Sequence, residues 1–253
     1  MDLCVSNRFQ GFFIHHSSFN TVLIQIVTAF PGMFDTVFAH SIVKRAVEAG
    51  LVRIEVIDLR EFTLDKHHRV DDTPFGGGPG MVMKAEPLFR AAEFLTGQTE
   101  DKPKILLPNA QGAAFNQAIA DRLAQEKHLI LFCGHYKGVD QRFIDQWVDE
   151  EISLGDYILS GGEIPAMIII DAIVRLLPGA ISDIESALTD SFRNGLLEGP
   201  VYTRPEDFYG LKAPEILLSG HHAKIAEWRH QQALNITRRR RPDLMNKNDD
   251  RET

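Results

Sequence analysis

Two glycine-rich segments could bind a ligand through their backbone. The first, Gly76–Gly80, follows the acidic pair Asp71–Asp72, whose carboxylates could accept hydrogen bonds from the edge of a nucleobase. The second, Ser153–Glu163, joins the end of an expected strand to the start of an expected helix. Glycine lets the main chain approach a bound molecule closely, and α/β proteins bind ligands at the carboxyl ends of their strands. Spacing alone leaves a tight surface turn as an equal alternative for both segments.

The most apolar stretch of the chain, residues 164–177, contains two charged side chains. Asp171 and Arg175 are spaced by one helical turn, so they share one face of a helix. We expect both side chains to be at least partly buried. The spacing fits a structural ion pair about as well as a catalytic pair.

Positive charge is concentrated near the C-terminus of an acidic chain. The 253 residues contain 27 Lys and Arg against 35 Asp and Glu, which gives a formal net charge of −8. Within residues 221–241, Lys224, Arg229 and Arg238–Arg241 stand against Glu227 alone, and the pattern there is helical. A cationic helix of this kind suits the phosphate backbone of RNA, and the alternative is a solvated helix face.

Other common sites are excluded by spacing. A dinucleotide-binding loop would place G-x-G-x-x-G after the first strand, where residues 30–33 are Phe-Pro-Gly-Met. The loop Gly76–Gly80 continues with Met81 rather than Lys-Ser or Lys-Thr, so it is not a phosphate-binding P-loop. We predict no metal site, because the histidines occur as adjacent pairs without the spacing of zinc ligands, at 15–16, 67–68 and 221–222.

The framework for these residues is an alternation of strand and helix patterns. Apolar and β-branched runs predict strands over residues 22–30, 52–60, 104–108, 129–134 and 152–159. Helical spacing predicts helices over residues 33–50, 85–95, 115–126 and 140–149, and a further helix that opens near Pro165. Such alternation predicts an α/β fold with a parallel sheet and helices on both faces.

Composition indicates a globular protein with one large domain. Hydrophobic residues make up 44% and charged residues 25%, which excludes a disordered chain. No segment is long and apolar enough to be a membrane span. The two cysteines, Cys4 and Cys133, cannot form a disulfide framework, which indicates a reducing, cytoplasmic location. We interpret residues 1–21 as a disordered extension rather than a signal peptide, because histidines interrupt its apolar patch.

Five long motifs, in one order, resemble a known enzyme family. They are Val70–Met81, Cys133–Arg142, Ile152–Met167, Asp190–Pro205 and Leu217–Arg229. The chain from residue 22 to about residue 242 resembles the bacterial tRNA (guanine-N1)-methyltransferases, which methylate guanosine 37 next to the anticodon. The resemblance implies a SPOUT-type α/β domain with a deep trefoil knot. It also implies S-adenosylmethionine as the methyl donor, tRNA as the substrate, and a homodimer whose active site is shared between subunits.

The resemblance also implies a division of the chain and roles for its residues. Residues 22–180 would form the knotted donor-binding domain, 181–214 a linker that carries the catalytic aspartate, and 215–253 a basic helical tRNA-binding domain. Asp190 would be the general base and Arg175 the catalytic arginine. The donor would be bound by Gly134, Leu154, Gly155, Asp156, Tyr157, Ile158, Leu159, Gly161 and Gly162. The RNA would be bound by Asp71, Ser186, Arg238, Arg239, Arg240 and Arg241.

These residue types suit the reaction that the resemblance implies. Guanine N1 carries a proton at neutral pH, and a carboxylate such as Asp190 could remove it. Charge then accumulates on guanine O6, where the guanidinium of Arg175 would stabilise it. Lys137 stands where the family often has a glutamate that could hold a cation, so a role for Mg²⁺ is left open.

Two other classes of function are alternatives to the methyltransferase. A non-catalytic RNA-binding protein of the same fold would keep the basic helix but lose Asp190, Arg175 or the glycines, all of which are present. A hydrolase that uses Asp and His would need a nucleophile-and-base motif, which the sequence lacks. The sequence therefore favours the methyltransferase.

Overall fold

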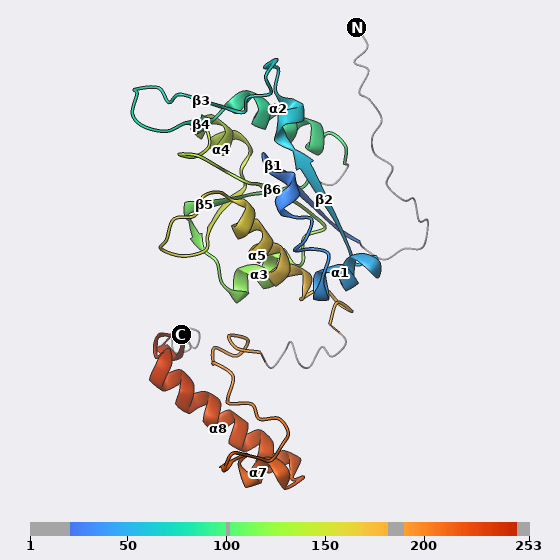
Figure 1. The fold of residues 1–253 in the computed structure, drawn as a ribbon, viewed down its shortest axis with the longest axis vertical. Coiled ribbons are helices and arrows are strands. Elements are labelled where there is room, and N and C mark those ends of the chain that lie inside the picture. Colours follow the sequence, from blue (N-terminus) through green and yellow to red (C-terminus); the bar gives the residue numbers. More distant parts are fainter. Residues whose placement is uncertain (1–20, 100–101, 182–189, 247–253) are drawn as a thin grey trace.

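Five parallel strands form the central sheet of the protein, in the spatial order β2–β1–β6–β5–β7 (Figure 1). The computed structural model describes residues 21–99, 102–181 and 190–246. The strands are β1 Val22–Thr28, β2 Val52–Asp58, β5 Lys104–Ala114, β6 His128–Phe132 and β7 Glu150–Ser153. The central strand β6 is buried along its whole length, as expected for a parallel sheet that is covered on both faces.

Helices cover both faces of this sheet (Figure 1). Three pack against one face, namely α1 (Ser41–Glu48), α3 (Gln117–Leu123) and α5 (Glu163–Val174). Two pack against the other, namely α2 (Ala85–Thr96) and α4 (Gln141–Trp147). Successive residues of β1 point to opposite faces, so Ile26 belongs to the first core and Val27 to the second. The predicted α/β fold with helices on both faces is confirmed, while the trefoil knot stays a prediction.

The first helix is shorter than its sequence pattern. The pattern predicts a helix over residues 33–50, but a short 3-10 helix, η1 (Pro31–Met33), comes first and α1 begins only at Ser41. Between them, Phe34 is 1% exposed and stacks on Phe38 with ring centroids 5.7 Å apart. Burial of this aromatic pair outweighs the local helical preference and holds the segment in turns.

Strand β5 is longer than predicted, and its extension contains a bulge. Pro108 and Ala113 both pair with Ile152 of β7, so the residues between them leave the ladder. Proline lacks the N–H group that a ladder requires, which explains where the bulge begins. The bulge places residues 107–110 at the carboxyl edge of the sheet.

A two-stranded ribbon projects from the same edge of the molecule (Figure 1). Its strands, β3 (Asp71–Asp72) and β4 (Val82–Met83), are antiparallel and carry the loop Gly76–Gly80 between them. The ribbon follows a second 3-10 helix, η2 (Leu59–Phe62). Its position is fixed by a backbone hydrogen bond of 2.9 Å from Met83 to the carbonyl of Gly138.

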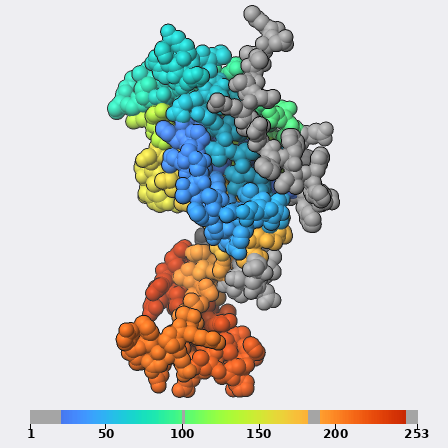
Figure 2. All heavy atoms as spheres, turned by 45° about the vertical axis from the view of Figure 1, so that its right-hand side comes forward, coloured from blue at the N-terminus to red at the C-terminus, as the bar shows by residue number. Residues whose placement is uncertain are grey.

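The C-terminal residues form a separate helical lobe below the sheet domain (Figures 1 and 2). It contains β8 (Asp207–Phe208), β9 (Leu211–Lys212), α7 (Glu215–Leu218), α8 (His222–Arg240) and α9 (Asp243–Asn246). The helix predicted over residues 221–241 corresponds to α8. An ion pair of 2.7 Å between Arg193 and Asp121 of α3 ties the preceding segment to the sheet domain. Within the described residues, no helix has the length and apolar character needed to cross a bilayer.

Candidate functional site

A pocket lies at the carboxyl ends of β5, β6 and β7. Its wall consists of residues 107–110 from the bulge, 134–139 after β6, and most of 152–162 after β7. This edge is where ligands bind in open α/β sheets. The wall contains eight of the nine residues predicted to bind the donor: Gly134, Leu154, Gly155, Tyr157, Ile158, Leu159, Gly161 and Gly162. The ninth, Asp156, is exposed and lies outside the wall.

Two loops of the pocket touch backbone to backbone. The amide of Gly162 donates a hydrogen bond of 2.7 Å to the carbonyl of Gly134. A Cβ atom at Gly162 would lie 2.9 Å from the Cα of Cys133, closer than a side chain tolerates. Glycine is therefore required here for the β7–α5 loop to close against the end of β6.

A buried carboxylate supports the floor of the pocket. Glu163, the first residue of α5, is 1% exposed and accepts a hydrogen bond of 2.7 Å from the Thr28 hydroxyl. Its other oxygen lies 3.5 Å from Nε2 of His135, a residue of the pocket wall. The ring of His135 also packs on Phe30 with centroids 4.7 Å apart. These contacts hold the imidazole in place between the floor and the rim.

The neighbouring cysteine is not equipped for nucleophilic chemistry. Cys133 is fully buried, and burial raises the pKa of its thiol well above the usual value, with a smaller contribution from the carboxylate of Glu163. A thiol in this state stays protonated at neutral pH, and only the thiolate is an effective nucleophile. The pocket therefore does not support a cysteine-dependent reaction.

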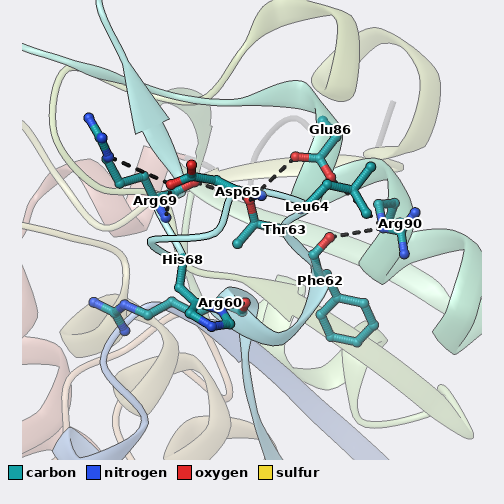
Figure 3. Close-up of polar contacts among 9 residues, drawn as sticks. All are labelled: Arg60, Phe62, Thr63, Leu64, Asp65, His68, Arg69, Glu86 and Arg90. Carbon is teal, nitrogen blue, oxygen red and sulfur yellow. Dashed lines mark hydrogen bonds and ion pairs between the residues drawn. The ribbon is translucent and has the colours of Figure 1, made fainter. Parts of the chain in front are cut away.

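The loop that leads to Asp71 is held by a polar network (Figure 3). Glu86 of α2 accepts a hydrogen bond of 3.0 Å from the amide of Leu64. Asp65 accepts one of 3.0 Å from the amide of Arg69, and this bond lowers the pKa of the Asp65 carboxyl. Two further bonds join the same region, from Arg90 Nε to the carbonyl of Phe62 and between His68 Nδ1 and the carbonyl of Arg60. The network fixes the chain immediately before the acidic pair.

Asp71 lies close to the pocket rim. Tyr136, a wall residue with a φ of 63°, has a raised phenol pKa because it is partly buried and because the Asp71 carboxylate is nearby. Asp71 itself is half-buried in β3, while Asp72 is exposed. Asp71, in strand β3 of the glycine-rich ribbon, is therefore close enough to the pocket wall for its charge to act on Tyr136.

The two predicted catalytic residues form an ion pair. Arg175 follows α5 as its C-cap, and its Nη2 lies 2.7 Å from Oδ2 of Asp190. The alternative in which Arg175 pairs with Asp171 is wrong, because Asp171 is exposed and Arg175 reaches away from the helix to Asp190. The expectation that Asp171 is partly buried fails for the same reason, since its face of α5 is open to solvent.

The predicted RNA contacts are spread over the molecule. Arg238, Arg239 and Arg240 occupy the last turn of α8, where positive charge is favoured by the helix dipole. Arg241 differs from them because it forms an ion pair of 2.8 Å with Asp243. Ser186 lies outside the described residues. None of the four arginines lines the pocket.

The sequence did not indicate several wall residues as ligand contacts. They are Leu107, Pro108, Asn109, Ala110, His135, Tyr136, Lys137, Gly138 and Val139, with Ile152 and Pro165 at the margins, whereas Ser153 and Ser160 lie in the expected glycine-rich segment. Residues 135–139 share a recognisable signal, because they follow the carboxyl end of the parallel strand β6. Pro108 carried a second signal, because a proline within a strand pattern marks a bulge or an edge.

Comparison with known proteins gives one consistent result. A family model described as tRNA (Guanine-1)-methyltransferase TrmD matches residues 22–247. A tRNA (guanine-N(1)-)-methyltransferase of Moorella thermoacetica is 55% identical over 223 residues, which cover 88% of this chain and 89% of the relative. Proteins of the same name from Listeria monocytogenes and Brevibacillus brevis are 52% and 53% identical, with 88% of this chain and 91% of each relative covered.

Proposed function

Because the chain belongs to the tRNA (guanine-1)-methyltransferase family, we propose that it transfers a methyl group from S-adenosylmethionine to N1 of guanosine 37 in tRNA. Membership of the family implies methylation of guanine N1 in tRNA. Our proposal adds the identity of the methyl donor and the position next to the anticodon. The observation that carries the proposal is the pocket at the carboxyl ends of β5, β6 and β7, which gathers eight of the nine expected donor-binding residues. We place the enzyme in the cytoplasm with its tRNA substrate.

The pocket fits a donor that is bound by main-chain groups. Its wall is rich in glycine and apolar side chains, and the contact of Gly162 with Gly134 shapes it from backbone alone. Peptide N–H and C=O groups of the β7–α5 loop can bond the edge of an adenine ring and a ribose. S-adenosylmethionine, when bound, supplies an electrophilic methyl group on its sulfonium sulfur. The protein then has to bind the donor and the guanine, orient them for transfer, and exclude water from the site.

Arg175 and Asp190 complement the reacting edge of guanine. N1–H is a donor and the adjacent O6 is an acceptor, so the edge needs an acceptor and a donor side by side. The Asp190 carboxylate and the Arg175 guanidinium are placed side by side, 2.7 Å apart. We assign removal of the N1 proton to Asp190 and stabilisation of the charge on O6 to Arg175.

The basic end of α8 supports binding of the tRNA backbone. Within the described part of the chain, no carboxylate lies within ion-pair distance of Arg238, Arg239 or Arg240, so their charges are available to phosphates. Asp71, beside the pocket rim, would accept hydrogen bonds from a base that flanks the target. Contacts with phosphates would position the RNA, and contacts at the pocket rim would recognise its bases.

An exposed apolar surface on α5 supports a homodimer. Apart from Glu163 and Asp171, every residue of this helix is apolar, which is typical of a helix that is largely buried. In the single chain, however, Ile164 and Ile168, one turn apart, are 48% and 46% exposed. Ile158, on the pocket loop, is 86% exposed. A second subunit that covers these side chains would also place its own residues near the pocket, so we propose a dimer with a shared active site.

A direct assay tests the function. The purified protein is incubated with methyl-labelled S-adenosylmethionine and an unmodified tRNA transcript that has guanosine at position 37, and the nucleosides are then analysed. We expect 1-methylguanosine, and none in a matched transcript with adenosine at position 37. Binding of tRNA without any transfer would instead identify a non-catalytic RNA-binding protein. Methylation that persists in the adenosine-37 transcript would contradict the assigned position.

A further inference from the structure

The wall of the pocket is almost free of charged side chains. Among the described residues that line the pocket, Lys137 is the only lysine, and arginine is absent. His135 is the only histidine. No aspartate or glutamate is part of this wall. A ligand in the pocket therefore meets one fixed cation, surrounded by backbone, apolar and uncharged polar groups.

Lys137 is exposed, but its backbone is fixed and its stem lies against the glycine-rich ribbon. Its amide donates a hydrogen bond of 2.9 Å to the carbonyl of Met81, which ties it to the glycine-rich ribbon. Its methylene stem lies across Gly80, where a Cβ atom would come within 2.7 Å of the Lys137 Cγ. Gly80 has a φ of +91°, so glycine is favoured there twice over, by backbone conformation and by the space that the lysine stem fills. The stem thus packs on the ribbon, and the ammonium group remains accessible.

The ammonium group of Lys137 has no carboxylate partner in the described part of the chain. Each ion pair between described residues is formed by a cation other than Lys137. Asp140, three residues after Lys137, pairs with Arg142. A lysine at the wall of a small-molecule pocket, tethered by its stem and unpaired, is ready to bind an anionic group of the ligand.

We propose that Lys137 binds the carboxylate at the methionine end of S-adenosylmethionine. The inference rests on the proposed function, which makes this molecule the donor. The donor carries a sulfonium, an ammonium and one carboxylate, and the carboxylate is its single negative charge. Lys137 is the one group of the wall with the opposite permanent charge. An RNA phosphate is the other candidate anion, but the position of Lys137 in the pocket wall favours the donor.

Decarboxylated S-adenosylmethionine provides the test. It keeps the adenosine and the sulfonium but lacks the carboxylate, so it presents only positive charges to Lys137. Dissociation constants of both compounds are measured by calorimetry, without RNA, for the wild-type enzyme and for Lys137→Gln. The wild type should bind the intact donor at least about tenfold more tightly than the decarboxylated compound, as expected for a charge-assisted contact. In Lys137→Gln the intact donor should bind about tenfold more weakly.

The decarboxylated compound should bind Lys137→Gln no more weakly than it binds the wild type, because a repulsion has been removed. Lys137→Met keeps the stem against Gly80 without the charge and should behave like Lys137→Gln. Lys44→Gln makes the same chemical change on the exposed surface of α1 and should leave both constants unchanged.

Three outcomes would overturn the inference. Equal weakening of both compounds in the Lys137 variants would mean that the lysine only shapes the pocket. Unchanged binding of both, with weaker tRNA binding, would assign the lysine to an RNA phosphate. Equal affinity of the wild type for both compounds would remove the carboxylate contact while leaving the proposed function intact. If the wild type bound neither compound, the proposed donor itself would be wrong.

Discussion

Nη2 of Arg175 lies 2.7 Å from Oδ2 of Asp190, although the two residues are fifteen positions apart in the chain. Their side chains are 41% and 37% exposed, so water screens the pair. Ion pairs of this exposure contribute at most about 1 kcal/mol to stability. The contact therefore opens at little cost, as the proposed function requires of two side chains that would bond to guanine instead. The ion pair contributes little to the stability of the fold.

Replacement of the carboxylate should stop methyl transfer. Asp190→Asn keeps the shape of the side chain but cannot take up the N1 proton, so we expect single-turnover methyl transfer to fall by about 10² or more. Binding of S-adenosylmethionine without RNA should stay nearly unchanged. The matched control is Asp145→Asn, which removes an exposed carboxylate of α4 on the opposite face of the sheet and should keep nearly full activity. Retention of more than about a tenth of the wild-type rate by Asp190→Asn would mean that another group is the base.

The four C-terminal arginines should not contribute equally to tRNA binding. Each phosphate contact lowers the slope of log K against log salt by about 0.7 to 0.9. Arg239→Gln should weaken tRNA binding and flatten this slope. Arg241→Gln should change it less, because the Arg241 guanidinium is already paired with Asp243. The slopes are measured by titrating labelled tRNA at several salt concentrations. Equal slopes for the wild type and both variants would identify the run as a solvated helix face.

The free energy of unfolding should decrease as the pH falls below 6.5, with His128 as one cause. This histidine is 6% exposed, and its Nε2 lies 2.9 Å from the side-chain oxygen of Gln25. Burial lowers the pKa of His128 from the usual 6.5, opposed by the weaker field of Glu55. The unfolded chain therefore takes up a proton near pH 6.5 while the folded protein does not. The stability is fully present above pH 6.5 and is lost as the pH falls toward the lowered value.

Urea unfolding at pH 7.5 and at pH 5.5 measures this effect. His128→Gln removes the titrating group and should show a smaller loss of stability between the two pH values than the wild type. His230→Gln, on the exposed surface of α8, should lose as much as the wild type. If His128→Gln and the wild type lost the same amount, the lowered pKa would not contribute to the pH dependence.

Local pattern was a good guide wherever burial follows the period of the element. The strand β1 shows this, since Ile26 and Val27 face the two cores in turn, as the apolar run predicts. The pattern failed where tertiary contacts outweigh it. Phe34 is buried in the core instead of forming part of a helix. Pro108 begins a bulge in β5, which pairs with β7 both before and after the bulge. Periodicity shows neither effect, because the burial of Phe34 depends on the segments packed around it and the bulge depends on the missing N–H group of Pro108.

The sequence predicted a glycine-rich ligand pocket, but not the contacts that Lys137 and Arg175 make. The glycines of the β7–α5 loop were identified from composition, whereas Lys137 was noticed only as a departure from a family motif. Its place in the wall depends on the close approach of Gly80, which lies more than fifty residues earlier in the sequence. Arg175 was assigned two alternative roles, and helical spacing favoured Asp171 as a partner. Only the return of the chain after α5 brings Asp190 to it instead.

The last prediction concerns whether each active site is built from one subunit or from two. Gly155, in the pocket wall, has a φ of +144°, and Gly155→Trp should block the pocket. Asp190→Ala removes the proposed base. If the pocket of one subunit works with Asp190 of its partner, a mixed dimer contains one doubly defective site and one intact site. After random exchange about half of the dimers are mixed, so activity should recover to about a quarter of the wild-type value. Circular dichroism of each variant serves as the folding control. A site built within one chain is defective in every combination, so activity that stayed at background after verified exchange would refute the shared site.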